Sequence, residues 1–190
     1  MRTLVIIVSI VALASMTGCA SNKNLIVKAS ISSRQDIFQE AQPMQATPGK
    51  AVLKVEFTVK NFKARFINSY FKHTDPPYTA VLNIDGQSTL LSDEPVLEDL
   101  PGDFKENPEV GIGWKYNFKK TLLLQPGKHH VSIAIPISDV IIEKEIYLKE
   151  GNNILTLLPI YNTPVTRYQK YARFSTGLRG ISVKQNNQDI

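Results

Sequence analysis

The alternation of apolar and polar side chains between Ala51 and Phe62 constrains the fold of this chain more than any other feature. The odd-numbered positions are apolar (Leu53, Val55, Phe57 and Val59), and the even-numbered positions between them are polar (Lys54, Glu56, Thr58 and Lys60). A side-chain period of two is the pattern of a β-strand whose sheet has one face on a core and one face in water. The segment is therefore predicted to be a strand that turns its polar side chains to solvent.

Shorter stretches of the same kind run through the rest of the chain, with turn signals between them. They cover residues 25–31, 78–84, 87–92, 112–124, 131–135, 140–148, 153–160 and 180–184. Asp85-Gly86 is a hairpin dipeptide between two of them. Residues 153–160 are almost continuously apolar, which predicts burial on both faces. Many short strands and no convincing long helix predict an all-β chain that folds as a single antiparallel β-sandwich.

The first twenty residues follow a different pattern. Arg2 supplies a positive charge, and the apolar run LVIIVSIVALA extends from Leu4 to Ala14. Such a run suits the core of a signal peptide and is too short to cross a bilayer, which needs about 20 apolar residues. Small residues then lead to Cys19, the only cysteine of the chain.

Met16-Thr17-Gly18-Cys19 resembles the lipobox of bacterial lipoprotein precursors. Thr17, Gly18 and Cys19 match the family pattern, whereas Met16 stands where leucine is usual. The resemblance implies that the preceding residues are a cleaved signal peptide and that Cys19 becomes a lipidated, membrane-anchored N-terminus. Ala20 in place of aspartate implies the outer membrane of a bacterial cell envelope. The expected organisation is a signal peptide (1–18), a lipidated cysteine with a short tether (19–24), the sandwich (25–184) and a disordered tail (185–190).

Charge is distributed unevenly along the chain. The formal net charge is +5 at pH 7, but the segment from Ser92 to Gly113 has seven acidic residues against one lysine. Basic proteins often bind nucleic acid, which an exported lipoprotein rarely meets, so we expect no nucleic-acid partner. The basic surface is expected to meet anionic lipid headgroups, lipopolysaccharide or an acidic partner, and the acidic segment is expected to dock an envelope protein.

Catalytic and metal-binding patterns are missing from the sequence. His129 and His130 are adjacent on a predicted strand and therefore face opposite sides, so they cannot share one metal ion there. No G-x-S-x-G nucleophile elbow occurs, and Gly111-Ile112-Gly113 precedes a strand rather than the helix that a phosphate-binding loop requires. We therefore expect no catalytic residue, no metal site, no cofactor and no enzyme activity.

The acidic segment contains two carboxylate pairs, Asp93-Glu94 and Glu98-Asp99. A glycosidase would hold two carboxylates rigidly across a cleft, and a calcium site would gather several carboxylate oxygens. Adjacent pairs in a proline-rich loop without regular ligand spacing fit solvated charge better. We expect these four residues to face a partner, and cation binding by the segment remains an alternative.

An apolar stripe at period two follows the acidic segment, formed by Ile112, Trp114, Tyr116 and Phe118. Such a stripe is either part of the core or an exposed platform for sugar rings, and both interpretations are open for Trp114 and Tyr116. Aromatic and basic side chains also gather near the C-terminus, where they fit either an edge strand or contact with anionic headgroups: Arg167, Tyr168, Lys170, Tyr171 and Arg173.

Residues 121–160 resemble the second half of PEGA-like small β-sandwich modules. The matching residues lie in a Pro-Gly turn, the strand after it and a closing hairpin: Pro126, Gly127, His129 or His130, Val131, Gly151 and Asn153. The resemblance implies an immunoglobulin-like or PEGA-like module without catalysis, although a single cysteine excludes the immunoglobulin disulfide.

These features together predict a lipid-anchored protein that works by binding, as an accessory or scaffold component of an envelope complex. A lipoprotein that binds envelope carbohydrate through Trp114 is the first alternative. A hydrolase with a cleft beside residues 93–113 is the second.

Overall fold

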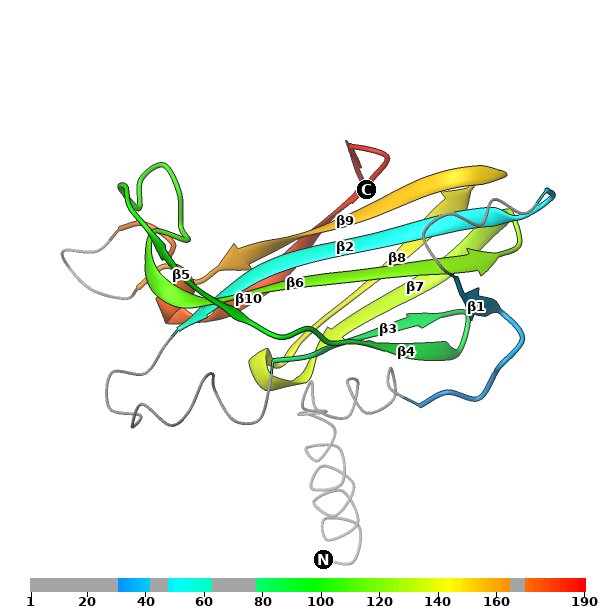
Figure 1. Ribbon diagram of the computed structural model, residues 1–190, viewed down its shortest axis with the longest axis horizontal. Helices are drawn as coiled ribbons and strands as arrows, with labels where there is room; N and C mark the ends of the chain where they lie inside the picture. Colours follow the sequence, from blue (N-terminus) through cyan, green and yellow to red (C-terminus); the bar gives the residue numbers. More distant parts are fainter. Residues whose placement is uncertain (1–30, 42–47, 63–77, 165–169) are drawn as a thin grey trace, which may run out of the picture.

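The computed structural model describes residues 31–41, 48–62, 78–164 and 170–190 of the chain. In these residues the strands form two sheets, A and B, which pack face to face (Figure 1). The strands are β1 (Phe38–Glu40), β2 (Ala51–Phe62), β3 (Ala80–Ile84), β4 (Gln87–Leu91), β5 (Val96–Leu100), β6 (Gly111–Leu124), β7 (Gly127–Ile135), β8 (Val140–Leu148), β9 (Gly151–Tyr161), β10 (Leu178–Gln185) and β11 (Gln188–Asp189). The prediction of an all-β sandwich is confirmed.

Helical structure in the described ranges is limited to two single turns, η1 (Pro136–Ser138) and η2 (Phe174–Thr176). Within these ranges no helix has both the length and the apolar character needed to cross a bilayer.

Sheet A has the strand order β1-β6-β2-β9-β10-β11, and β5 pairs with the other end of β6. β2 and β6 are antiparallel along the whole of β2, from Ala51 opposite Leu124 to Phe62 opposite Gly113. β2 and β9 run parallel, with Ala51 opposite Gly151. The sequence predicts antiparallel pairing throughout the sandwich, and this pair departs from that prediction. The long connection through sheet B lets β9 return in the same direction as β2.

Sheet B has the order β4-β3-β7-β8, and all its pairs are antiparallel. Its first hairpin turns at Asp85-Gly86, and both residues have positive φ, 48° and 92°. This is the backbone that a two-residue hairpin of the favoured twist needs. The hairpin predicted from this dipeptide is confirmed.

The core lies between the sheets and includes the predicted apolar face of β2, whose side chains are at most 1% exposed: Leu53, Val55, Phe57 and Val59. β9 differs from its prediction. Leu155 and Leu157 are buried, but Ile154 and Leu158 on the other parity are 37% and 39% exposed. The expected burial of this strand on both faces is wrong, because no strand or helix within the described ranges covers these side chains on the outer face of sheet A.

Polar side chains link the two sheets along one open side of the sandwich. Gln87 of β4 accepts hydrogen bonds at 2.8 and 3.0 Å from two successive backbone N–H groups at the start of β1, and it donates one to the Phe38 carbonyl at 2.9 Å. Next to it, the Glu40 carboxylate accepts from the Thr89 hydroxyl at 2.7 Å and from Lys120 of β6 at 2.8 Å. These contacts tie β1 and β6 of sheet A to β4 of sheet B.

The C-terminal residues 185–190 are not the disordered tail that the sequence predicts. Asn186 and Asn187 adopt positive φ, 50° and 66°, and turn the chain into β11, which pairs with β10. Asparagine tolerates this left-handed conformation better than most residues, so the polar composition encodes a turn here. The predicted signal peptide, Cys19 with its tether, residues 25–30 of the first predicted strand, and Arg167 and Tyr168 all lie outside the described residues.

Candidate functional site: an acidic strand over a buried ionic cluster

The acidic segment contains a strand where the sequence predicts a long loop. β5 pairs antiparallel with the first part of β6, with Leu97 opposite Trp114 and Asp99 opposite Ile112. Pro95 and Pro101 lie just outside the strand, so neither removes a hydrogen bond from its interior. The proline-rich composition therefore marks the ends of a short strand.

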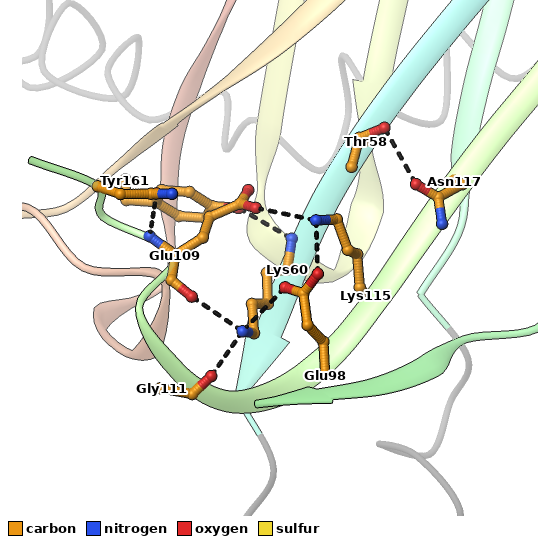
Figure 2. Close-up of polar contacts among 9 residues, drawn as sticks. Thr58, Lys60, Glu98, Glu109, Gly111, Lys115, Asn117 and Tyr161 are labelled. Carbon is orange, nitrogen blue, oxygen red and sulfur yellow. Dashed lines mark hydrogen bonds and ion pairs between the residues drawn. The ribbon is translucent and has the colours of Figure 1, made fainter. Parts of the chain in front are cut away.

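Lys60 lies beneath this segment. Because Lys60 lies among the alternate polar positions of β2, the sequence predicts that it is exposed, but the residue is only 1% exposed. Its ammonium donates to the carbonyl oxygens of Glu109 at 2.8 Å and Gly111 at 2.6 Å, and it lies 3.1 Å from Oε2 of Glu98 (Figure 2). This last contact is an ion pair and not an aligned hydrogen bond. The prediction is wrong because the acidic segment covers this end of β2.

Glu98 connects Lys60 to a second lysine. Its other carboxylate oxygen accepts from Lys115 at 2.8 Å, and Lys115 also lies 3.9 Å from Glu109. The Tyr161 hydroxyl donates to Glu109 at 2.7 Å and accepts from the backbone N–H of Lys60 at 2.9 Å. These five residues, which we call the Lys60 cluster, pair two lysines with two glutamates and carry no net charge (Figure 2).

The protonation states in the cluster follow from its contacts. Burial raises the pKa of the Glu98 carboxyl, but Lys115 and Lys60 outweigh this effect and hold the pKa below its ordinary value of 4.5. Burial also raises the pKa of the Tyr161 hydroxyl far above its ordinary value, and the neighbouring Glu109 carboxylate raises it further. At neutral pH Glu98 is therefore ionised and Tyr161 keeps the proton that it donates.

Two glycines make room for the cluster. A Cβ on Gly113 would lie 2.6 Å from Cε2 of Phe174, 2.7 Å from the carbonyl oxygen of Asn61 and 3.0 Å from Cε of Lys60. Gly111 has a φ of 101°, which suits glycine, and supplies a carbonyl to Lys60. The Phe174 ring centroid lies 5.0 Å from the ammonium of Lys60 as a cation–π contact. The sequence signal for this packing is the Gly-x-Gly at the start of a strand.

The four carboxylates that the sequence assigns to a partner surface separate into two groups. Asp93, Glu94 and Asp99 are exposed, and Asp93 accepts a hydrogen bond from the backbone N–H of Glu94 at 2.9 Å. Glu98 does not face solvent freely, because both of its oxygens point to lysines of the cluster. Its interpretation as solvated charge is wrong, since Lys60 reaches it from β2, which is distant in sequence, and Lys115 reaches it from the neighbouring strand β6.

Tyr116 and Trp114 differ although they belong to one stripe. Tyr116 is 0% exposed and lies between Tyr78 and Phe118, with ring centroids 5.5 and 5.7 Å away. Its interpretation as a binding residue is wrong, because its side chain is enclosed in the hydrophobic core. Trp114 is half-buried against the edge of the core, and Ile112 is 54% exposed. The stripe passes from core to surface because β6 extends beyond sheet B (Figure 1).

The two adjacent histidines of β7 point to opposite sides, as predicted. His129 is buried and contacts the Asp85 carboxylate at 2.7 Å and the Gln125 carbonyl at 2.9 Å, whereas His130 is exposed. In the part of the chain that the structure describes, no group of three His, Cys, Asp or Glu side chains is placed to hold a metal ion.

No protein-family model matches this chain, and comparisons with curated proteins and with solved structures also find no match. The lipobox and PEGA-like resemblances therefore stay predictions from the sequence.

Proposed function

We propose that this protein is a membrane-anchored lipoprotein that works by binding, as an accessory or scaffold component of a bacterial cell-envelope complex. The lipobox at Cys19 supports the anchor. The observation that carries the binding role is the acidic strand β5, whose exposed side chains are held in one position by the Lys60 cluster.

The cluster fixes β5 relative to three other segments of the chain. Glu98 of β5 contacts Lys60 of β2 and Lys115 of β6, and the carbonyls of Glu109 and Gly111 complete the coordination of the ammonium. Removing charges from water costs several kcal/mol per ion, and only well-placed partners offset that cost. A charged cluster therefore adds little net stability over an apolar one, but its directional contacts determine where β5 lies.

The acidic segment exposes apolar side chains as well as charged ones. Val96 and Leu97 are 61% and 46% exposed on opposite faces of the sheet, and the exposed carboxylates of the same segment are Asp93, Glu94, Asp99, Asp103 and Glu106. Exposed apolar side chains bordered by polar ones are typical of protein–protein contacts. We call residues 93–100 the acidic edge, and we propose that a basic envelope protein docks on it.

Affinity purification from gently solubilised envelopes, followed by mass spectrometry, tests this proposal. We expect a stoichiometric protein partner that is lost when the exposed carboxylates of the edge are neutralised together, as Asp93→Asn, Glu94→Gln and Asp99→Asn. A matched control removes three exposed carboxylates elsewhere, as Glu56→Gln, Glu143→Gln and Glu145→Gln, and should keep the partner. Recovery of the wild-type protein alone would contradict the accessory role.

The anchor has a separate test. Cys19→Ala should abolish incorporation of labelled palmitate and move the protein from the membrane fraction to the soluble fraction. Two acyl chains give stable anchoring, since each buried CH₂ contributes about 0.8 kcal/mol. An unchanged membrane fraction without labelled lipid would overturn the lipoprotein assignment.

A further inference from the structure

One edge of β5 has no partner strand in the described parts of the chain. β5 pairs with β6 along its other edge, and no described backbone group outside β6 bonds to residues 96–100. In an antiparallel strand, alternate residues point their N–H and C=O groups away from the neighbouring strand. β5 therefore presents a row of backbone donors and acceptors to an incoming chain.

The side chains next to this edge are not those of a protected edge strand. Proteins usually block such edges with charges, prolines and short strands, and Pro95 and Pro101 limit β5 at both ends. Yet Val96 is 61% exposed on one face, and Leu97 is 46% exposed on the other, beside Ile112 at 54%. A strand added at this edge would cover apolar side chains on both faces of the sheet.

We propose that β5 is the docking strand for an extended, basic segment of a partner protein, which pairs with its free edge. Backbone hydrogen bonds would supply affinity, as in other cases of β-strand addition. Apolar side chains of the partner would cover Val96 and Leu97, and its lysines or arginines would meet Asp93, Glu94 and Asp99. A second copy of β5 would bring like charges together, so the charge favours a basic partner over self-association. This inference rests on the proposed function and names the chemistry of its partner.

The Lys60 cluster prepares β5 for this role. Lys60 and Lys115 hold Glu98 from beneath, so the strand is already extended and paired with β6 before a partner arrives. Ordering a loop on binding reduces affinity, and a preformed strand avoids that loss.

The test uses the purified protein in detergent micelles and three synthetic peptides of nine residues. The first alternates lysine with valine, the second replaces lysine by glutamate, and the third is the basic peptide with alternate backbone nitrogens methylated. The third keeps charge and side chains but cannot pair along its methylated edge. We expect only the first to bind measurably, to shift the amide resonances of residues 96–100 and to slow hydrogen exchange of those that point outward.

Variants then locate the contact. Val96→Thr with Leu97→Thr should weaken binding of the basic peptide about tenfold, because threonine keeps strand propensity and removes apolar contact. Leu90→Thr is the matched control, because Leu90 is a 50% exposed leucine on β4 of the other sheet. It should leave binding unchanged.

Three results would overturn the inference: equal binding of the basic and methylated peptides, equal weakening by the control, or unchanged exchange in β5. The proposed function fails separately. If the envelope partner is retained by the Val96→Thr, Leu97→Thr variant but lost when the carboxylates are neutralised, the acidic edge docks a partner without strand pairing.

Discussion

Replacing Lys60 by methionine should destabilise the protein by about 3 kcal/mol. The variant loses two hydrogen bonds to carbonyls, at 2.8 and 2.6 Å, and an ion pair at 3.1 Å. Breaking a buried ion pair from one side costs about 3–5 kcal/mol. We place this variant at the lower end, because the Glu98 side chain is 26% exposed and keeps Lys115. Methionine fills much of the volume of the lysine stem, so the cavity contribution is small.

Urea unfolding followed by circular dichroism measures this loss. With a slope of about 2 kcal/mol per molar urea, the midpoint should fall by about 1.5 M. Lys54→Met is the matched control on the same strand, because Lys54 is only half-buried. Its effect should stay within about 0.5 kcal/mol.

A second variant separates the charge from the packing. Lys60→Met combined with Glu98→Leu removes both members of the ion pair, and it should be more stable than Lys60→Met alone if the Glu98 carboxylate, left with Lys115 as its ion-pair partner, contributes to the loss. Hydrogen exchange in β5 should increase in Lys60→Met and not in Lys54→Met. If Lys60→Met is no less stable than the control, the cluster does not hold β5 and our account of the site is wrong.

Three other changes test separate contacts. Gly113→Ala should lower the free energy of unfolding by about 2 kcal/mol, measured in urea, because the new Cβ would lie 2.7 Å from a backbone carbonyl oxygen. Gly180→Ala, where a Cβ would have open space, should leave the free energy of unfolding nearly unchanged. Equal effects of the two changes would refute the crowding at Gly113. Gln87→Leu leaves two backbone N–H groups and a carbonyl without the Gln87 amide as their partner. Hydrogen exchange of the β1 amides should therefore become faster, and the free energy of unfolding should fall by about 2 kcal/mol. Unchanged hydrogen exchange would contradict the link between the sheets. The pKa of Glu98 is lowered in the folded state, so its stabilisation is complete above its ordinary value of 4.5 and disappears as the pH falls through the lower, folded value. Acid titration of stability should therefore be shallower in Glu98→Gln, and an identical acid limb would show that Glu98 is not paired.

Local patterns predict the parts of this fold that depend on neighbouring residues. The alternation in β2 identifies four core side chains correctly, because a strand with one covered face needs that period and little else. Asp85-Gly86 predicts its hairpin because the turn geometry is encoded in the two residues themselves. The exposure of Asp93, Glu94 and Asp99 is also predicted correctly, from the acidic, proline-rich composition of their segment.

The rest of the site depends on segments that meet only in the folded chain. Lys60 has the parity of a solvent-facing residue, and its burial follows from the acidic segment that begins more than thirty residues later. The sequence predicts that Glu98 is a solvated carboxylate, but in the folded chain Lys60 of β2 and Lys115 of β6 lie beside it. Tyr116 and Trp114 share one pattern, and their difference depends on where sheet B ends. Sequence alone gives the types of side chain at the site but not the contacts between them.

The parallel pair of β2 and β9 also determines when this chain can fold. Ala51 lies opposite Gly151, 100 residues later, and β6 on the other side of β2 also comes late. Such distant contacts make folding slow, because the loops must close before the contacts form. Among the described strands, the partners of the two edges of β2 are complete only at Leu124 and Tyr161. If the predicted signal peptide directs export, the two parts of sheet A, β1-β6-β2 and β9-β10-β11, can join only after residues 151–157 have emerged.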